Sequence, residues 1–313
     1  MNKHIQHDAL EALRRRIEGT VTADAPLAPY TAYRIGGPTA VWVAPAHESD
    51  VGEALATIAE LDLPLFLLGR GTNLLVSDTG WPGITLYLGD NLTGWSMTGG
   101  TASALAGTPL TDFIRAMVAK GLGGMEYMAG IPGSVGGALV MNAGAFGQEI
   151  ESSVAAVRGF DFSGSPFRKE RRDLTFGYRA APDLKNRVVT AGEFHLTAGD
   201  AGELARRVDQ TLARRTERQP LDRPSCGSVF KRPAGNYAGA LIEAAGLKGE
   251  RVGDAEISTR HAGFILNTGS AAAADVYALI RRIQDRVSAR FGVTLEREVR
   301  LLGQFGDRFF TGE

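Results

Sequence analysis

Clustered glycine constrains this chain more than any other feature of its sequence. The chain contains 40 glycines among 313 residues, about twice the usual share for a globular protein. They follow no fixed period, which excludes collagen-like and solenoid folds. The densest cluster, "MAGIPGSVGGALVMNAGAFG" at 128–147, holds six glycines. Its backbone can therefore turn sharply and approach a neighbour or a ligand closely.

This stretch does not have the composition of a flexible linker. Met128, Ile131, Val135 and Leu139 alternate with its glycines and would be exposed in a disordered tether. A tightly packed turn and a ligand cradle both remain open. Two shorter segments, "YRIGGP" at 33–38 and "LGRGTNLLV" at 68–76, raise the same question. None of the three fits a Walker loop or the G-x-G-x-x-G fingerprint, so the usual dinucleotide fold is not supported.

Charge and cysteine content restrict the class of protein. The chain has 34 basic and 35 acidic residues, without the basic excess that nucleic-acid or membrane-surface binding usually needs. No run of 18 apolar residues is present, and the first thirty residues lack the apolar region of a secretory signal. A single cysteine, Cys226, excludes an internal disulfide and suits a reducing compartment. We expect a cytoplasmic monomer without nucleic-acid, membrane or metal partners.

Helical and strand patterns are mixed along the chain, which indicates an α+β fold rather than a regular doubly wound sheet. The break "RQPLDRPSCGS" at 218–228 is the best candidate for a domain boundary. Helices are predicted at 8–17 (with Asp8 near its N-cap), 48–62, 109–120, 201–217, 237–246 and 271–291. Strands are predicted at 40–44, 64–69, 83–88, 92–106, 154–162, 187–197, 262–269 and 293–303.

Eight segments in this order resemble the UDP-N-acetylenolpyruvoylglucosamine reductases (UDP-N-acetylmuramate dehydrogenases) of bacterial peptidoglycan synthesis. They span about residues 27 to 303 and read "TAYRIGGP", "LGRGTNLL", "GMEYMAGIPGSVGGALVMNAGAFGQE", "FGYR", "PSCGSVFKRP", "AGALIEAAGLKG", "HAGFILNTG" and "LEREVRLLG".

The resemblance implies a two-part FAD-binding domain of the vanillyl-alcohol-oxidase type and a C-terminal α/β substrate-binding domain. We therefore predict a first FAD-binding subdomain at 1–90, a second at 91–217 and the substrate domain at 218–313, whose last strand could return to the flavin domain. FAD would be held noncovalently. NADPH would be the hydride donor, and UDP-N-acetylglucosamine enolpyruvate would be the acceptor.

The resemblance also assigns flavin contacts to the three glycine segments. The predicted FAD-binding residues are Tyr33, Arg34, Ile35, Gly36, Gly69, Arg70, Gly71, Thr72, Asn73, Gly130, Ile131, Pro132, Gly133, Ser134, Gly136, Asn142, Ala143 and Gly144.

Hydride addition from N5 of reduced flavin to an enolpyruvyl ether builds an enolate, which needs stabilisation and a proton donor. The resemblance assigns these roles to Arg179 of "FGYR", Glu298 of "LEREV" and Ser228 of "CGSVFK", with Ser228 as the proton donor. In a strand Glu296 and Glu298 face the same side, so geometry leaves both open and only the motif selects Glu298. Lys231 is a candidate for binding a substrate phosphate or carboxylate.

The resemblance is to the shorter subtype of the family. Only eight residues separate "FGYR" from the strand that starts at Val188, which leaves no room for the tyrosine-bearing loop that caps substrate in the longer subtype. Ala181 occupies the position where many relatives have a serine, so any contact of that serine is missing here.

Three other functions remain as alternatives. Cys226, His261 and Asn267 form a nominal set for a cysteine hydrolase, although the glycine clusters would then be unexplained. A redox-inactive nucleotide-sugar binder or transferase could use the glycine loops for a diphosphate. A flavin oxidase of the same superfamily would pass electrons to oxygen instead of to the enolpyruvyl nucleotide.

Overall fold

The computed structural model describes residues 1–98 and 100–312. Its contacts divide the chain into two compact units. Unit 1 comprises Met1–Ala23, Val41–Arg70 and Gly83–Arg215, and unit 2 comprises Asp24–Ala40, Gly71–Pro82 and Thr216–Glu313. Each unit therefore combines segments that are distant in sequence, whereas the sequence predicted three consecutive blocks.

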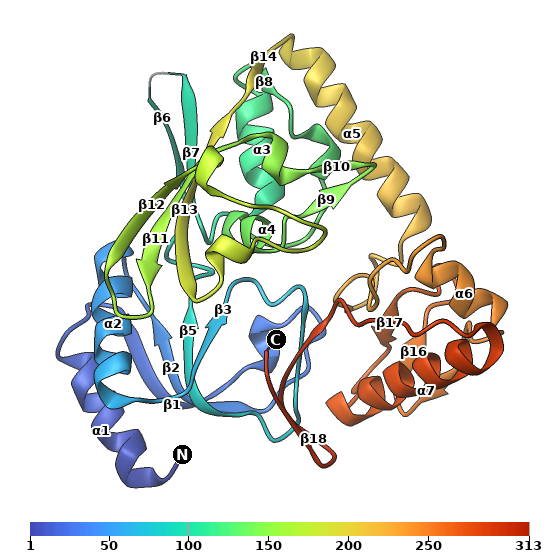
Figure 1. Ribbon diagram of the computed structural model, residues 1–313, viewed down its shortest axis with the longest axis horizontal. Coiled ribbons are helices and arrows are strands. Elements are labelled where there is room, and N and C mark those ends of the chain that lie inside the picture. The colour runs from blue at the N-terminus through green and yellow to red at the C-terminus, as the bar shows by residue number, and fades with distance from the viewer. Residues whose placement is uncertain (99, 313) are drawn as a thin grey trace. The chain divides into compact units, whose positions relative to one another are not determined.

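The first part of unit 1 packs two helices on a sheet (Figure 1). The helices are α1 (Lys3–Arg14) and α2 (Glu48–Leu61). The sheet has the order β1–β2–β5–β3, with β1 Thr20–Pro26, β2 Pro38–Ala44, β5 Trp81–Tyr87 and β3 Leu65–Leu68. Apolar residues from both helices and the sheet form one buried cluster, in which Leu13, Leu55, Val43 and Ile84 are fully inaccessible. This burial supplies most of the stability of a surface helix.

Side-chain hydrogen bonds fix the start of α1 and the first turn of α2. The prediction that the first helix begins near Asp8 was wrong, because Asn2 caps it: the Asn2 side chain accepts a hydrogen bond from the Ile5 N–H at 2.9 Å. In the first turn of α2, the buried Asp50 carboxylate accepts backbone N–H groups from Glu18 at 3.2 Å, Gly19 at 3.0 Å and Ala46 at 2.8 Å. Asp50 thus joins the residues just before β1 to the residues just before α2.

The second part of unit 1 is a five-stranded antiparallel sheet with the order β12–β11–β13–β7–β6. Helices α3 (Leu110–Val118) and α4 (Val135–Val140) lie beside it (Figure 1), and α3 contributes Phe113, whose ring lies 5.2 Å from that of Phe194. The strands are β6 Trp95–Thr98, β7 Thr101–Leu105, β11 Val154–Asp161, β12 Pro166–Glu170 and β13 Arg187–His195.

Shorter elements surround this sheet. Strand β8 (Leu122–Gly123) pairs with β14 (Thr197–Ala198), and β9 (Gly144–Ala145) pairs with β10 (Gln148–Glu149). Helix α5 (Ala201–Arg218) follows β14 and packs Leu204 and Val208 into the core under the sheet. The 3-10 turns of the chain are Ala28–Tyr30, Glu126–Met128, Ile150–Ser152, Arg171–Asp173 and Pro182–Leu184.

Unit 2 has its own core, built around α6 (Ala238–Ala244) and α7 (Ala273–Phe291). Beside them lies the antiparallel sheet β15–β16–β17, with β15 Arg251–Val252, β16 Ala255–Ile257 and β17 Ile265–Asn267. The predicted apolar stripe of α7 is confirmed at Val276, Leu279, Ile280, Ile283 and Val287, all with no exposed surface. Phe291, which was predicted to belong to this stripe, is 36% exposed because the helix has reached its end.

A second sheet of unit 2 joins distant parts of the chain. Strand β18 (Arg300–Phe305) pairs in parallel with β4 (Leu74–Val76) and antiparallel with β19 (Arg308–Thr311). Just after β4, the Asp78 carboxylate accepts the backbone N–H groups of Ala273 at 2.8 Å and Ala274 at 3.1 Å, and so caps α7. The residues around β4 are therefore an integral part of unit 2.

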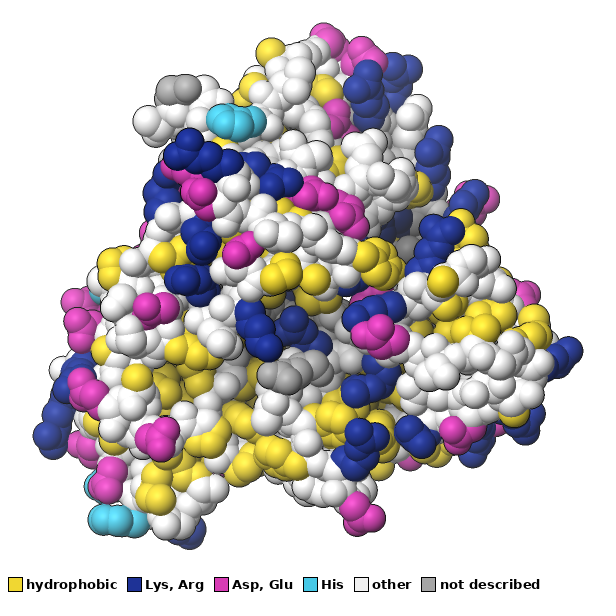
Figure 2. Space-filling model, viewed as in Figure 1, with side chains coloured by type: hydrophobic (Ala, Val, Ile, Leu, Met, Phe, Trp, Pro, Cys, Tyr) yellow, Lys and Arg dark blue, Asp and Glu magenta, His cyan; other side chains and the backbone are white. Residues whose placement is uncertain are grey.

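The surface agrees with the balanced charge of the chain. In the view of Figure 2, basic and acidic side chains are interspersed, with several dark-blue side chains along α5. Within 1–98 and 100–312, no helix combines the length and apolarity needed to cross a membrane. The same residues contain no group of three or more His, Cys, Asp or Glu arranged to hold a metal ion.

Candidate active site

Two of the glycine segments meet in unit 1. The loop after β3 carries Gly69, and a Cβ atom at that position would lie 3.2 Å from the hydroxyl of Ser134. Ser134 is the N-cap of α4, and its Oγ accepts the Gly137 N–H at 3.3 Å. Segments about 65 positions apart in the sequence are thus brought side by side.

The longest glycine segment is folded and well packed. Met128, Val135 and Leu139 have no exposed surface, so the exclusion of a linker is confirmed. The sequence did not predict α4 within this stretch. Among the described residues, the backbone N–H groups of Gly133 and Ser134 donate to no protein group. Two adjacent free N–H groups beside a residue without a side chain can donate to an anionic or carbonyl oxygen of a ligand.

The end of the glycine segment 128–147 contacts the turn that carries Arg179. Gly177 and Ala180 exchange two backbone hydrogen bonds, at 2.9 and 3.0 Å, and so hold Arg179 in a tight turn with a φ of 55°. The fully buried Asn142 donates to the Gly177 carbonyl at 3.1 Å and to Glu149 at 2.7 Å. The guanidinium of Arg179 itself donates to the Gly144 carbonyl at 3.5 Å. Asn142 therefore orients the turn through its side chain.

A second arginine reaches the same glycine segment, because the Arg215 guanidinium stands over the ring of Phe146, two residues after Gly144. Burial, and then the positive charge of Arg179, lower the pKa of Arg215 below its ordinary value. Arg215 lies in the last turn of α5, in a run that the sequence analysis interpreted only as a basic half of a helix. It is the main residue of this region that sequence reasoning missed.

In unit 2 the backbone brings Ser228 close to Glu298. Val229, next to Ser228, accepts the Glu298 N–H at 2.8 Å, and Phe230 forms a bridge with Arg297. The prediction that Glu296 and Glu298 lie within a strand was wrong, because β18 starts only at Arg300. Both Ser228 and Glu298 are half-buried.

The two glutamates differ in their surroundings. Glu296 forms an ion pair with Lys231, whose backbone N–H also donates to the Glu296 carbonyl at 2.9 Å. The Glu298 carboxylate, in contrast, lies close enough to Cys226 to raise the pKa of its thiol, although burial is the larger cause. Lys231 therefore already has a carboxylate partner, and Glu298 faces the segment that carries Ser228.

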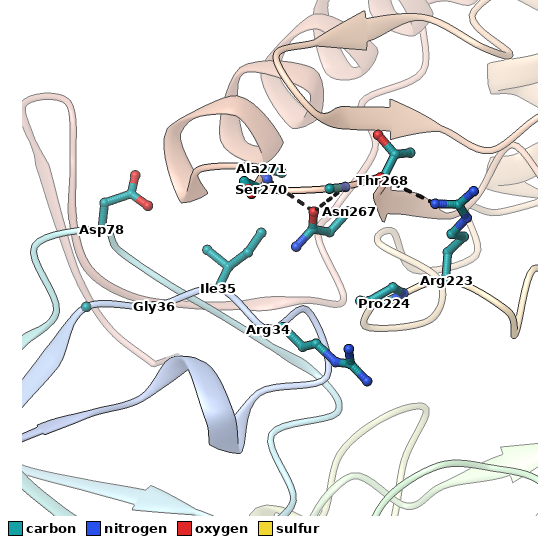
Figure 3. Close-up of a pocket in the computed structure, with 12 residues that line it drawn as sticks. Arg34, Ile35, Gly36, Asp78, Arg223, Pro224, Asn267, Thr268, Ser270 and Ala271 are labelled. Atoms are coloured by element: carbon teal, nitrogen blue, oxygen red, sulfur yellow. Dashed lines mark hydrogen bonds between the residues drawn. The ribbon is translucent and has the colours of Figure 1, made fainter.

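The first glycine segment lines a pocket of unit 2 (Figure 3). The pocket has a volume of about 540 Å³, and Arg34, Ile35 and Gly36 form one side of it. Asn267 lies between Asp78 and Arg223, and its side-chain oxygen accepts the Gly269 and Ala271 N–H groups at 3.1 Å each. Tyr33 does not line this pocket: it is fully buried in the core of unit 2.

The predicted FAD residues of the second glycine segment, 69–73, are divided between the two units. Gly69 and Arg70 belong to unit 1, whereas Gly71, Thr72 and Asn73 belong to unit 2. Gly71 has a φ of 60°, and a Cβ there would lie 2.0 Å from the Tyr30 carbonyl, so only glycine fits. The Asn73 side chain donates to the Glu298 carbonyl at 3.0 Å. Both residues thus also support the local fold.

Sequence profiles of two families match the chain. The FAD binding domain family matches residues 39–166, and the C-terminal domain of UDP-N-acetylenolpyruvoylglucosamine reductase matches residues 219–302. The UDP-N-acetylenolpyruvoylglucosamine reductase of Synechococcus sp. (strain JA-3-3Ab) is 42% identical over 295 residues, which cover 93% of this chain and 94% of that protein. The chain belongs to the UDP-N-acetylenolpyruvoylglucosamine reductase family.

Two further relatives agree with this assignment. UDP-N-acetylenolpyruvoylglucosamine reductase 2 of Bacillus cereus is 39% identical over 92% of this chain and 94% of its own length. The crystal structure of the reductase from Thermus caldophilus is 33% identical, with a TM-score of 0.75 over 91% of this chain and 99% of that one. The predicted family and the α+β fold, with an FAD-binding domain of the vanillyl-alcohol-oxidase type, are confirmed.

The protein is accordingly an FAD-dependent oxidoreductase. The residues of unit 1 fit that cofactor: the free N–H groups of Gly133 and Ser134 are hydrogen-bond donors, and Gly69 presents no side chain beside them. Such donors suit the carbonyl and phosphate oxygens of a flavin dinucleotide.

Proposed function

We propose that this protein reduces the enolpyruvyl group of UDP-N-acetylglucosamine enolpyruvate to a lactyl ether, with NADPH as the reductant. The product would be UDP-N-acetylmuramate, a cytoplasmic precursor of peptidoglycan. Membership of the reductase family supports the reaction. The observation that carries the residue assignment is the backbone link at 2.8 Å between Val229, next to Ser228, and Glu298.

FAD, when bound and reduced, supplies the hydride. The chain would hold it through the predicted residues of the three glycine segments, with the N–H groups of Gly133 and Ser134 as donors in unit 1. We propose that Arg179 binds the substrate carboxylate and stabilises the negative charge that develops on it, because a guanidinium stays protonated and offers a planar pair of donors.

Ser228 is the proposed proton donor to carbon. A serine hydroxyl is a weak acid, so it can donate only to a strongly basic enolate in a preorganised site. We assign Glu298 to the same site, because its backbone is tied to the Ser228 segment while Glu296 is paired with Lys231. A substrate phosphate or carboxylate that binds Lys231 would have to compete with Glu296.

An anaerobic spectral titration tests this function. NADPH should bleach the flavin absorbance near 450 nm, a wavelength typical of oxidised flavin in general, and the enolpyruvyl nucleotide should restore it. Ser228→Ala should keep flavin reduction by NADPH within about twofold while reoxidation by the nucleotide slows about 10²- to 10⁴-fold, the usual contribution of a general acid.

Ser225→Ala, a change three residues earlier in the same segment, is the matched control and should behave like the wild type. Equal loss of both half-reactions in Ser228→Ala would contradict the proton-donor assignment. A wild-type protein whose reduced flavin is not reoxidised by the enolpyruvyl nucleotide would contradict the proposed reaction itself.

A further inference from the structure

Arg215 is buried and has no hydrogen-bond partner within its unit or elsewhere among the described residues. It exposes 9% of its surface, and its Nε and Nη2 atoms are inaccessible and unpartnered. These two nitrogens form one edge of the guanidinium, from which two parallel N–H groups point in the same direction. A carboxylate or a phosphate accepts such a pair with two of its oxygens.

Packing holds this edge in place. A Cβ atom at Gly130 would lie 2.8 Å from Leu212 and 2.9 Å from Cδ of Arg215, so the glycine segment lies directly against α5. The Arg215 guanidinium stands over the ring of Phe146, 5.7 Å from its centroid. A ring face attracts the positive charge, but it accepts no hydrogen bond from the Nε–Nη2 edge.

The charges nearby make this burial unfavourable in the protein alone. A second positive charge reaches the same short turn, because the Arg179 guanidinium donates to the carbonyl of Gly144, two residues before Phe146. Elsewhere on the same helix, the exposed Arg207 is paired with Glu203 at 2.5 Å and lies 3.9 Å from Glu126. Buried arginines are normally paired with a carboxylate, whereas exposed ones need no partner. Here the exposed Arg207 has carboxylate partners and the buried Arg215 has none. An unpaired buried charge is costly unless a partner is supplied.

We propose that Arg215 is a ligand-binding residue that, together with Arg179, forms a two-arginine site for an anionic oxygen group of the bound nucleotide. The inference rests on the proposed function, in which Arg179 receives the substrate carboxylate. Arg215 donates from its Nε–Nη2 edge to a carboxylate or a phosphate. The ligand therefore supplies the negative charge that the protein lacks at this point.

Arg215→Lys keeps the charge but removes the two-donor edge, and Arg215→Met removes the charge while keeping an apolar stem. The neighbouring exposed Arg214, changed to Lys and to Met, is the control. Dissociation constants of the oxidised flavoprotein are measured for UDP-N-acetylmuramate, UDP-N-acetylglucosamine and NADP⁺. Both Arg215 variants should weaken at least one of them about 10- to 100-fold, the usual effect of losing hydrogen bonds to a charged group.

The pattern of loss identifies the source of the anion. Weakening for UDP-N-acetylmuramate alone indicates the carboxylate, equal weakening for both UDP-sugars indicates their diphosphate, and weakening for NADP⁺ alone indicates a phosphate of the donor. Without ligand, Arg215→Met should raise the melting temperature, because an unpaired charge beside Arg179 is removed. A lowered melting temperature with all three dissociation constants unchanged would overturn the proposal in favour of a structural role.

A test with a simple anion distinguishes a failure of the Arg215 proposal from a failure of the proposed function. Sodium pyrophosphate should raise the melting temperature of the wild type more than that of Arg215→Met. If the enolpyruvyl nucleotide failed to reoxidise the flavin, the reaction would be wrong, yet this difference would still support the anion site. If neither pyrophosphate nor any of the nucleotides distinguished the two proteins, the Arg215 proposal would be wrong.

Discussion

Cys226 shows how burial decides the chemistry of a single residue. Its thiol is 5% exposed, and burial, with a contribution from Glu298, raises its pKa to about 12. A thiol with this pKa is protonated at neutral pH and is not a nucleophile. His261 uses its Nδ1 to accept the Gly263 N–H at 3.1 Å, and Asn267 donates to the Tyr33 carbonyl. The Cys/His/Asn set therefore does not support a cysteine hydrolase.

The raised pKa of Cys226 predicts a loss of stability at alkaline pH. The folded thiol keeps its proton up to about pH 12, whereas an unfolded one ionises from about pH 9. The unfolded state thus binds fewer protons above that value, and the free energy of unfolding should fall by about 1 kcal/mol between pH 8 and pH 10.

Urea unfolding of the wild type and Cys226→Ala at pH 8, 9 and 10 measures this contribution. Subtracting the variant cancels groups that ionise in both proteins, so the wild type alone should show the extra decline. Parallel curves would show that Cys226 makes no such contribution. Complete loss of activity in Cys226→Ala would instead support a catalytic thiol.

Motifs located candidate residues in the sequence, but not their surroundings. "FGYR" singled out Arg179 and "CGSVFK" singled out Ser228, because both segments resemble motifs of the reductase family. Arg215 was missed because a basic run in a helix normally faces solvent. Its burial depends on Gly130 and Phe146, and nothing in the local pattern of α5 indicates that they pack there.

Among the elements, α2 is tied into unit 1 by its first turn. Asp50 accepts three backbone N–H groups and is 3% exposed. Asp50→Ala should lower the free energy of unfolding by about 1 to 3 kcal/mol, since it removes the buried acceptor of three backbone N–H groups. Thermal unfolding followed by circular dichroism measures the change.

Two variants in the same helix control for this prediction. Asp50→Asn keeps the shape of the side chain and should cause an intermediate loss. Glu53→Ala lies on the exposed side of α2 and should change stability by less than about 0.5 kcal/mol. A melting temperature of Asp50→Ala equal to that of Glu53→Ala would show that the Asp50 hydrogen bonds contribute little.

Periodicity predicted the long elements and failed for the short ones. Helices α2 and α7 follow their apolar patterns closely, because each buries a continuous stripe. Helix α4 was missed, since six residues rich in glycine carry no helical signal and are held by packing and by the Ser134 cap. The last strand starts seven residues later than its alternating sequence suggested, where pairing with β4 begins.

At the scale of the whole molecule, unit 2 is assembled from three separate segments. The core around α7 includes Tyr33, Ile35 and Leu75 from the early segments. Strand β4 pairs with β18, and Asp78 caps α7. The sequence predicted a domain boundary at 218–228, but pairings over more than two hundred residues are invisible to local patterns.

An isolated fragment 216–313 should therefore not fold. It would lose the partner of β18, the cap of α7 and part of its core, which should leave it without cooperative unfolding. Circular dichroism melting and the dispersion of its amide NMR signals measure this, with the full chain as the control. A fragment with a sharp thermal transition would contradict the prediction.

The pairing of β4 with β18 also bears on how the protein emerges from the ribosome. Leu74–Val76 is synthesised more than two hundred residues before its partner at 300–302. At elongation rates of about 5 to 20 residues per second this delay is roughly 10 to 45 seconds. Throughout that interval a short apolar strand has an unpaired edge, which is the kind of surface that chaperones bind and that aggregates when translation outpaces folding.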